Sequence, residues 1–372
     1  MNKLKIMLYV NNLGRKSVNG TAITLLAKNL TDFLSKSGHD VLIVGNKDIV
    51  EEEINVPFLA LKNGNKSGDI YYAKRLSEVI RYYKPDVIHA FMRPMSTNLA
   101  LSTLFGKNLD SVYIGSIHNA NNFLSYNKFY HLSYRFLMKK ILSKLDWITA
   151  PSQAILNDVK KAYFLPEEKL EILPNFINFD KISQLAQEEI EEDIPEEYIL
   201  NIGRLDYQKN HILLIKTFKK IVEEFPDEKL LIVGDGELRP QLEELVKQLS
   251  LEKNVFLIGY KNNPWKYYKK AKLFVLTSRF EGLPLVLIES LYFKVPIISF
   301  DIEPSKELTE GGKYGILVKS FDEGALHTTI LNFLRGNFPV ESLKEEGYKK
   351  ALEFSLENYV NHLLRLINKE NI

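Results

Sequence analysis

The amino-acid sequence predicts an α/β fold with two doubly wound parallel sheets, each in a Rossmann-like domain. The chain has 372 residues, of which 45% are hydrophobic and 26% are charged; this balance is that of a folded chain of about two domains. Short apolar runs alternate with helical patterns in both halves. Continuous apolar strands between helices are typical of parallel sheets covered on both faces, and two such halves imply two domains.

The individual elements follow from these patterns. In the first half, strands are expected at residues 6–10, 41–44, 87–90, 112–117 and 147–150. Helical patterns separate them at residues 21–37, 71–83 and 128–143. In the second half, strands are expected at residues 198–202, 230–233, 255–258, 273–276, 296–299 and 315–318. The intervening helices are expected at residues 211–225, 239–249 and 285–293.

The boundary between the two domains is expected near Leu173-Pro174-Asn175, which separates residues 1–176 from residues 177–355. Residues 187–197 are polar and acidic, without strand character. In residues 356–372, apolar side chains at helical spacing predict a helix with one apolar face, which could pack back on the first domain. Ligands of doubly wound sheets bind beyond the carboxyl ends of the strands, so a cleft faced by both domains is the expected site.

Charge and composition narrow the class of protein. The net charge of +2 argues against a binder of nucleic acid, although residues 1–180 carry +7 and the remainder −5. There is no Cys, which excludes disulfides, thiolate zinc sites and a cysteine nucleophile. No apolar run approaches about 18 residues, and residues 3–10 read as a strand rather than a signal peptide. A cytoplasmic protein is expected, with contact to the inner face of a membrane left open.

The first candidate motif is Gly203-Arg204-Leu205-Asp206-Tyr207-Gln208-Lys209-Asn210, directly after an expected strand. Arg204 and Lys209 are two cations in a strand-to-helix loop, and Asn210 is a plausible N-cap of the next helix. Cations beside a helix N-terminus form a good diphosphate site. The alternative is that both are solvated surface cations.

The second candidate motif runs from Ser278 to Ser290 and includes Glu281-Gly282-Leu283-Pro284. Gly282 permits a tight loop that carries Glu281, and Pro284 suits the first turn of a helix. Glu289 lies in that helix among apolar neighbours, where desolvation of a carboxylate costs several kcal/mol on usual estimates. Vicinal sugar hydroxyls would satisfy it. The alternative is a buried Glu paired with a structural Lys or Arg.

These motifs resemble those of the retaining GT-B glycosyltransferases of group 1, whose Glu-x(7)-Glu signature would run here from Glu281 to Glu289. The resemblance covers most of the chain and is strong in the second half, at residues 202–210, 233–238 and 256–260. The first half matches loosely, as expected for a domain that binds a variable acceptor. Residues 174–178 are similar to the sequence with which the family leaves its first domain.

The resemblance implies a role for each matching residue. Arg204 and Lys209 would bind the diphosphate of a nucleotide-sugar donor, Glu281 would contact hydroxyls of the donor sugar, and Glu289 would accept hydrogen bonds from the ribose. The remaining residues implied in donor binding are Gly20, Gly203, Gly234, Tyr260, Gly282 and Leu283. The family usually has Gly-Gly where this chain has Asn19-Gly20, so this chain has a side chain at position 19 where the family has none. A Gly-x-Gly-x-x-Gly fingerprint is absent, which weighs against an NAD enzyme.

Two histidines stand at the ends of expected strands. His118 stands at the end of the strand at residues 112–117, and in similar proteins a His at this place faces the donor sugar near the anomeric centre. A lone His is more often structural, and we interpret His89, at another strand end, as a packing residue.

Residues 123–147 interleave aromatic and basic side chains, which suits an anionic membrane surface. The aromatic members are Phe123, Tyr126, Phe129, Tyr130, Tyr134, Phe136 and Trp147. The alternative is a core-facing helix whose charges face solvent.

Taken together, the residues and the resemblance predict transfer of a hexosyl or N-acetylhexosaminyl unit, with retention, from a nucleotide sugar to a hydroxyl of a glycan or lipid-linked acceptor in surface polysaccharide or glycolipid synthesis. A UDP donor is expected. The expected catalytic residues are Arg204, Lys209, Glu281 and His118. No Asp-x-Asp motif is present, so no metal and no other cofactor is expected. The alternatives are a nucleotide-sugar epimerase, a phosphorylase, and a catalytically inactive binding subunit.

Overall fold

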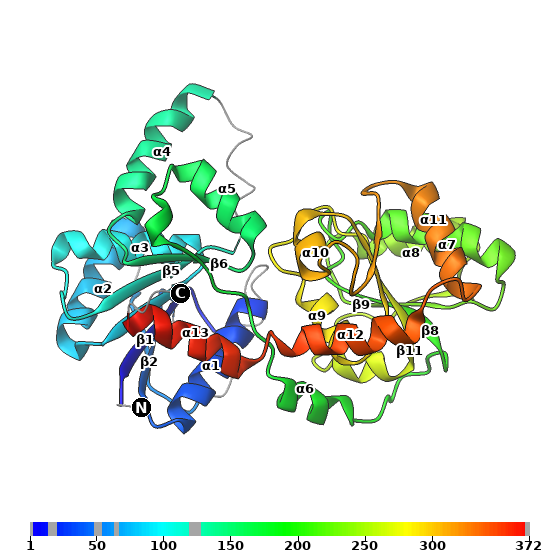
Figure 1. Ribbon diagram of the computed structural model, residues 1–372, viewed down its shortest axis with the longest axis horizontal. Coiled ribbons are helices and arrows are strands. Elements are labelled where there is room, and N and C mark those ends of the chain that lie inside the picture. The colour runs from blue at the N-terminus through cyan, green and yellow to red at the C-terminus, as the bar shows by residue number, and fades with distance from the viewer. Residues whose placement is uncertain (1–2, 14–20, 48–53, 63–66, 119–127, 369–372) are drawn as a thin grey trace. The chain divides into compact units, whose positions relative to one another are not determined.

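A computed structural model describes residues 3–13, 21–47, 54–62, 67–118 and 128–368. The chain divides into two compact units. Unit 1 comprises residues 1–176 together with residues 356–372, and unit 2 comprises residues 177–355. Each unit is a parallel sheet with helices packed on it (Figure 1). The predicted fold class is therefore confirmed.

The sheet of unit 1 has seven strands in the order β3-β2-β1-β4-β5-β6-β7, and all neighbouring pairs are parallel. The strands are β1 (Lys5–Val10), β2 (Asp40–Gly45), β3 (Phe58–Ala60), β4 (Val87–Phe91), β5 (Val112–Ser116), β6 (Trp147–Ala150) and β7 (Leu170–Ile172). The five long apolar runs of the sequence supply the central strands. The edge strands β3 and β7 were not predicted because each has three residues and a partly exposed surface.

Helices cover both faces of this sheet. They are α1 (Thr21–Lys36), α2 (Asp69–Tyr83), α3 (Arg93–Ser102), α4 (Lys128–Leu142), α5 (Gln153–Tyr163), α13 (Leu356–Asn368) and the 3-10 turns η1 (Thr103–Phe105) and η2 (Glu167–Lys169). Alternate residues of β1 point to opposite faces. Met7 and Tyr9 join the core beneath α2 to α5, and Ile6 and Leu8 join the core beneath α1 and α13.

Helix α13 belongs to unit 1 although it follows unit 2 in the sequence (Figure 1). Leu363 and Leu366 on its apolar face are fully buried. The indole nitrogen of Trp147 donates a hydrogen bond to the Leu366 carbonyl at 2.8 Å. This helix therefore completes the core on one face of the first sheet.

Unit 2 has a six-stranded parallel sheet in the order β10-β9-β8-β11-β12-β13. Its strands are β8 (Tyr198–Ile202), β9 (Leu230–Val233), β10 (Val255–Leu257), β11 (Ala271–Leu276), β12 (Ile297–Phe300) and β13 (Ile316–Val318). Its helices are α6 (Phe179–Ala186), α7 (His211–Glu224), α8 (Arg239–Gln248), η3 (Trp265–Lys270), α9 (Leu285–Tyr292), α10 (Glu303–Leu308), α11 (Glu323–Leu334) and α12 (Val340–Leu352). Side chains of α7, α8 and α11 share one core with the sheet, and α12 packs on α9.

The acidic stretch at residues 187–197 contains no helix, and regular structure resumes only with β8. No helix within the described ranges is both long enough and apolar enough to cross a bilayer.

Candidate functional site

The centre of the candidate site is a buried ion pair between Lys209 and Glu281. Lys209 lies in the loop after β8, and Glu281 lies in the loop after β11, the strand that pairs with β8. Because the two strands are parallel neighbours, their carboxyl ends bring both loops together. The Lys209 Nζ is 2.6 Å from Glu281 Oε1, and the side chains are 15% and 8% exposed. The predicted cation and the predicted carboxylate are therefore in direct contact.

Further hydrogen bonds join the two loops. The Thr277 hydroxyl donates to the Lys209 carbonyl at 3.0 Å. The amide N–H of Arg279 donates to the Gln208 carbonyl at 2.8 Å. In return, the Gln208 side-chain amide donates to the Phe280 carbonyl at 2.9 Å and to Glu281 Oε2 at 3.3 Å. These bonds hold the two loops together, and Gln208 also holds one oxygen of Glu281.

Asn210 occupies the N-cap position of α7, as predicted, but its side chain does not cap the helix. Its φ of 57° is left-handed, and it makes no side-chain capping bond. The Asn210 Oδ1 instead accepts a hydrogen bond from the Arg279 guanidinium at 3.0 Å. Asn tolerates this backbone region better than most residues, so the loop can turn sharply here and the side chain can serve the neighbouring loop.

Arg204, the second predicted cation, lies on a more exposed part of the same loop. Its side chain is 45% exposed and is 3.0 Å from Asp206 Oδ2. The other carboxylate oxygen of Asp206 accepts a hydrogen bond from the Lys209 amide at 3.1 Å. Asp206 thus links the Arg204 side chain to the backbone of Lys209 within the loop.

Three glycine-containing loops approach one another closely at the carboxyl edge of this sheet. A Cβ on Gly234, whose φ is 147°, would lie 1.9 Å from the Gly203 carbonyl oxygen. The Gly234 amide donates to the Gly259 carbonyl at 2.9 Å. Only glycine fits at position 234. The adjacent Tyr260 is 54% exposed, so its ring is accessible beside these loops.

Glu289 lies in α9 and is partly buried. Its Oε1 accepts a hydrogen bond from Trp265 Nε1 at 3.0 Å, and its Oε2 is 3.2 Å from the Tyr268 hydroxyl. Burial raises its pKa to about 7, although both hydrogen bonds and the charge of Lys209 act in the opposite direction. Two aromatic side chains hold this carboxylate. Among the described residues, Glu289 therefore does not have the structural Lys or Arg partner of the alternative interpretation.

Trp265 and Tyr268 were not singled out from the sequence. The sequence does contain an indication of an aromatic site, because the run Trp265-Lys266-Tyr267-Tyr268 lies in the connection between two strands. Gly282 and Leu283 fall between Glu281 and the start of α9, and Leu283 is buried.

The candidate histidines are both in unit 1. His118 follows β5, and both of its ring nitrogens are buried without a hydrogen-bond partner in the described part of the chain. Burial lowers its pKa to about 4, while the nearby Asn175 side chain acts in the opposite direction. His89 Nε2 is 2.7 Å from the Ser116 hydroxyl, and its ring stacks on Phe91. Burial lowers the pKa of His89 to about 3, which agrees with a packing role.

The structure divides the aromatic and basic segment at residues 123–147. Phe123 and Tyr126 lie outside the described residues, as does Gly20, and the side chains of Phe129 and Tyr130 are likewise not described. Tyr134 packs against the core, and Trp147 is partly buried in the core beneath α1 and α13. These two aromatic side chains are core residues, contrary to the membrane-facing interpretation.

Four other side chains form an exposed apolar surface, which we call the α4–α5 patch. Its members are Leu132, Phe136, Leu137 and Phe164, and they are 51%, 54%, 55% and 38% exposed. The rings of Phe136 and Phe164 stack with centroids 5.5 Å apart. Arg135 lies over the Phe164 ring and donates to the Ala162 carbonyl at 2.7 Å, which holds α4 and α5 together.

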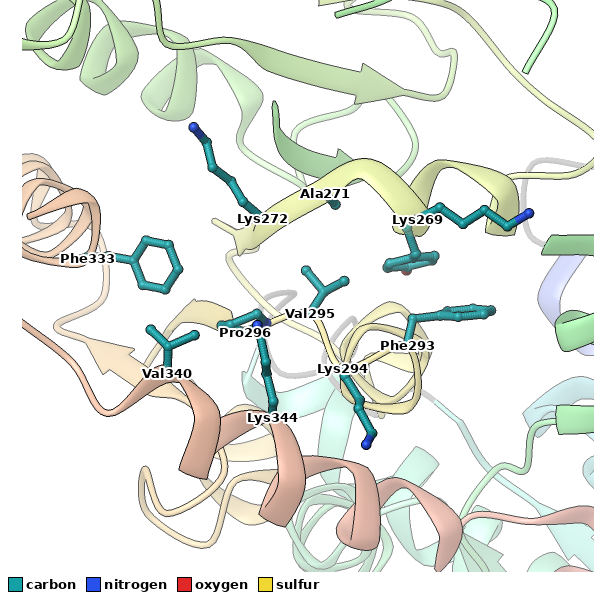
Figure 2. Close-up of a pocket in the computed structure, with 11 residues that line it drawn as sticks. Lys269, Ala271, Lys272, Phe293, Lys294, Val295, Pro296, Phe333, Val340 and Lys344 are labelled. Atoms are coloured by element: carbon teal, nitrogen blue, oxygen red, sulfur yellow. The ribbon is translucent and has the colours of Figure 1, made fainter. Parts of the chain in front are cut away.

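A cavity of about 480 Å³ lies elsewhere in unit 2 (Figure 2). Ala271, at the start of β11, and Pro296, just before β12, line it. It therefore lies at the amino ends of these strands, whereas Lys209 and Glu281 follow the carboxyl ends of β8 and β11. Within the described ranges, no three His, Asp or Glu side chains gather as ligands for a metal ion would.

Two protein families match the two parts of the chain. Residues 183–350 match the glycosyl transferases group 1, and residues 23–181 match glycosyltransferase family 4. A relative from Campylobacter jejuni is 30% identical over 95% of this chain and 96% of its own length. That relative is the N-acetylgalactosamine-N,N'-diacetylbacillosaminyl-diphospho-undecaprenol 4-alpha-N-acetylgalactosaminyltransferase.

Solved structures show the same fold. A glycosyltransferase from Rickettsia africae superimposes with a TM-score of 0.81 at 19% identity over 100% of both chains. The Anabaena protein HepE, in complex with UDP and glucose, superimposes with a TM-score of 0.77 at 16% identity over 98% of this chain and 99% of its own. The two parallel-sheet units, the two matching families and the full-length relative lead to one conclusion: the chain belongs to the group 1 glycosyltransferases of the GT-B fold and is a hexosyltransferase.

Proposed function

We propose that the chain transfers a hexosyl or N-acetylhexosaminyl unit from a UDP-linked sugar to a hydroxyl of a lipid-linked or glycan acceptor, with retention at the anomeric carbon. The observation that carries this proposal is the Lys209–Glu281 pair, held in two joined loops at the carboxyl edge of a parallel sheet. The full-length Campylobacter jejuni relative is named for a diphospho-undecaprenol acceptor, and the complex of HepE supports a UDP donor. Surface polysaccharide or glycolipid synthesis is the setting we propose.

The ion pair suggests how the donor would be bound. Lys209 and Glu281 are paired at 2.6 Å. The diphosphate of a donor would attract Lys209, and Glu281 would then be free to accept hydrogen bonds from the sugar hydroxyls. This exchange of partners leaves neither charge buried alone, which would otherwise be costly.

The reaction requires the nucleoside diphosphate to leave as an anion. Lys209 and the more exposed Arg204 would stabilise the negative charge that develops on this leaving group, which is electrostatic catalysis. In our proposal the acceptor hydroxyl attacks the face that the diphosphate leaves, and its proton passes to the departing phosphate oxygen. His118, a neutral imidazole because burial lowers its pKa to about 4, would contact a hydroxyl of the sugar.

We also propose that the α4–α5 patch contacts an anionic membrane surface. The exposed Lys140 on α4 and Lys161 on α5 accompany its four apolar side chains. Apolar side chains ringed by cations favour the boundary between lipid headgroups and acyl chains, and each basic residue contributes about 1 kcal/mol near an anionic surface. This surface would bring the enzyme to a lipid-linked acceptor.

The donor assignment is tested with the purified chain and a panel of UDP-, GDP- and TDP-sugars, first by thermal shift and then by transfer to a polyprenyl-diphosphate-linked glycan. We expect a UDP-sugar to stabilise the protein and to be consumed in the presence of acceptor, with an α-linked product by NMR. Transfer should persist in EDTA, since we propose that no metal or other cofactor takes part. Acceptor-independent epimerisation or phosphate-dependent cleavage would overturn the proposal in favour of an epimerase or a phosphorylase. Donor binding without any turnover would indicate an inactive binding subunit.

The membrane assignment is tested by co-sedimentation with vesicles of phosphatidylcholine, with and without phosphatidylglycerol. We expect binding to the anionic vesicles alone and loss of that binding in Phe136→Glu. Leu109→Glu is the matched control, because Leu109 is an exposed leucine of unit 1 outside the patch, 87% exposed. Equal binding to both kinds of vesicle, or equal loss in both variants, would contradict a role for the patch.

A further inference from the structure

The carboxylate of Glu289 is held by two aromatic side chains of one short element, η3. Trp265 Nε1 donates to Glu289 Oε1 at 3.0 Å. The Tyr268 hydroxyl lies 3.2 Å from Glu289 Oε2 and 3.1 Å from the carbonyl oxygen of Val286. Trp265 and Tyr268 are 7% and 1% exposed, so water does not compete readily for these contacts.

The Tyr268 hydroxyl has one proton but two acceptors within reach. Burial raises the pKa of this phenol well above its usual value, so the proton stays on Tyr268. If Glu289 is ionised, Tyr268 can donate to its carboxylate, and the Val286 carbonyl loses this donor. If Glu289 is protonated, its O–H can donate to Tyr268, which then donates to Val286. In both arrangements the Tyr268 proton is used in a hydrogen bond, but only the ionised one presents a carboxylate.

We propose that Trp265 and Tyr268 are positioning residues for Glu289. The Tyr268 hydroxyl donates its proton either to Glu289 or to Val286, and this alternative couples binding of the donor's ribose hydroxyls to ionisation of Glu289. This inference rests on the proposed donor site. Each carboxylate oxygen has one protein donor and keeps acceptor capacity for a vicinal diol. A protonated Glu289 uses its proton toward Tyr268 and accepts the diol poorly.

The charged and titratable groups around Glu289 fit this coupling. Tyr268 comes from η3, and Lys209 comes from the loop after β8, from which its positive charge favours the ionised form. The effect of burial is larger than the effects of these hydrogen bonds and of the Lys209 charge, and it raises the pKa of Glu289 to about 7. His211, at the start of α7 beside Lys209, is neutral at this pH because burial lowers its pKa to about 3. Loss of either aromatic hydrogen bond should therefore raise the pKa of Glu289 further.

The test measures the dissociation constant of a UDP-sugar by calorimetry between about pH 5.5 and 8.5. Its diesterified diphosphate does not titrate in this range. For the unaltered chain we expect the dissociation constant to rise up to tenfold per pH unit below about pH 7. Tyr268→Phe and Trp265→Phe should shift this transition upward by about 0.5 to 1 pH unit. Glu289→Gln should remove the transition and weaken binding at high pH.

Tyr198→Phe is the matched control. Tyr198 is also fully buried, and its hydroxyl donates to the Tyr267 carbonyl in the same η3 element at 2.8 Å, without touching Glu289. It should lower stability without moving the pH transition. If Tyr268→Phe leaves the transition in place, or Tyr198→Phe shifts it equally, the coupling is wrong although the donor site stands. If no nucleotide sugar binds the unaltered chain at any pH, the proposed function fails first.

Discussion

The two units share a parallel α/β architecture but differ in chemistry at the carboxyl edge of their sheets. In unit 2 this edge carries a buried charged pair, Lys209 and Glu281, and glycine loops in backbone contact. In unit 1 the corresponding edge carries a neutral imidazole, His118, and a second one, His89, lies inside β4; burial lowers the pKa of both. The comparison suggests that the same fold stabilises the charge of the leaving group in unit 2 and contacts uncharged hydroxyls in unit 1.

The largest expected effect comes from removing the charge in unit 2. Lys209→Ala should lower kcat/KM for transfer by about 10²–10³-fold, because a charge that stabilises the leaving diphosphate is lost. The measurement is steady-state transfer with the UDP-sugar that binds.

Lys272→Ala separates this effect from lost stability. Lys272 pairs with the buried Glu228 at 2.9 Å, at the amino end of β11 and away from the site. Both substitutions leave a buried carboxylate without its lysine and should destabilise the chain, but only Lys209→Ala should reduce transfer. An equal fall in kcat/KM would mean that the Lys209 effect is structural.

The second largest effect concerns the glycine loops. Gly234→Ala places a methyl group 1.9 Å from the Gly203 oxygen, so the loops after β8 and β9 must separate. We expect a loss of about 3 kcal/mol or more in the free energy of unfolding, and loss of UDP-sugar binding. Urea unfolding and calorimetry measure the two.

Gly336→Ala is the control, since Gly336 has a φ of 78° but open space around its missing Cβ. It carries the backbone strain without the clash and should cost only about 1 kcal/mol. Normal nucleotide binding by Gly234→Ala would disprove the close approach.

Acid should destabilise unit 1 more than unit 2. An unfolded His titrates near pH 6.5, but His89 and His118 in the folded chain titrate only near pH 3 and 4. Below about pH 6.5 the unfolded state therefore binds protons that the folded state does not. Each buried imidazole then costs up to about 1.4 kcal/mol per pH unit.

Unit 2 has an opposing contribution. His211, with a pKa of about 3, behaves like the imidazoles of unit 1. Glu289, with a pKa of about 7, is protonated in the folded state before its unfolded counterpart, so it adds stability as the pH falls from about 7 toward 4.5. The chain's two tryptophans, Trp147 and Trp265, report one unit each. Urea unfolding followed in Trp147→Phe and Trp265→Phe, at pH 7 and pH 5, should show the larger fall in midpoint for the Trp147 signal. A larger fall for Trp265 would contradict the comparison.

The smallest expected effect is the loss of a helix cap in each unit. It tests whether the Trp147 and Trp265 signals report the two units separately. The Ser152 hydroxyl caps α5 by accepting from the Ile155 amide, and Asp322 caps α11 by accepting from the Ala325 amide. Each Ala substitution should cost about 1 kcal/mol. Ser152→Ala should move mainly the Trp147 signal and Asp322→Ala mainly the Trp265 signal. Identical shifts of both signals would mean that the units unfold together.

Much of the fold could be predicted because long apolar runs mark central strands. β8, β9 and β6 have the predicted bounds, whereas β3 and β7 are too short and too exposed to give a pattern. The same pattern placed Lys209 and Glu281 in loops after strands. It could not pair them, because their contact depends on β11 lying beside β8, across two intervening strands in the sequence.

The finer geometry of the site was harder to predict for a different reason. Asn is a residue type that favours N-cap positions, and Asn210 stands at one. Its side chain does not cap the helix because it accepts a hydrogen bond from Arg279, a residue 69 positions away. Trp265 and Tyr268 read as ordinary aromatic residues, and their relation to Glu289 comes from the packing of η3 on α9. Side-chain partners that are distant in sequence leave no local pattern.

The placement of α13 has a consequence for how the chain is made. Its Leu363 and Leu366 are buried in the core of unit 1, yet a ribosome reaches them only after the whole of unit 2 has been synthesised. Unit 2 can fold on emerging, while in unit 1 one face of the sheet is covered by α1 but not yet by α13. A chaperone that shields exposed apolar surface would therefore encounter the earlier half of the nascent chain for longer than the later half.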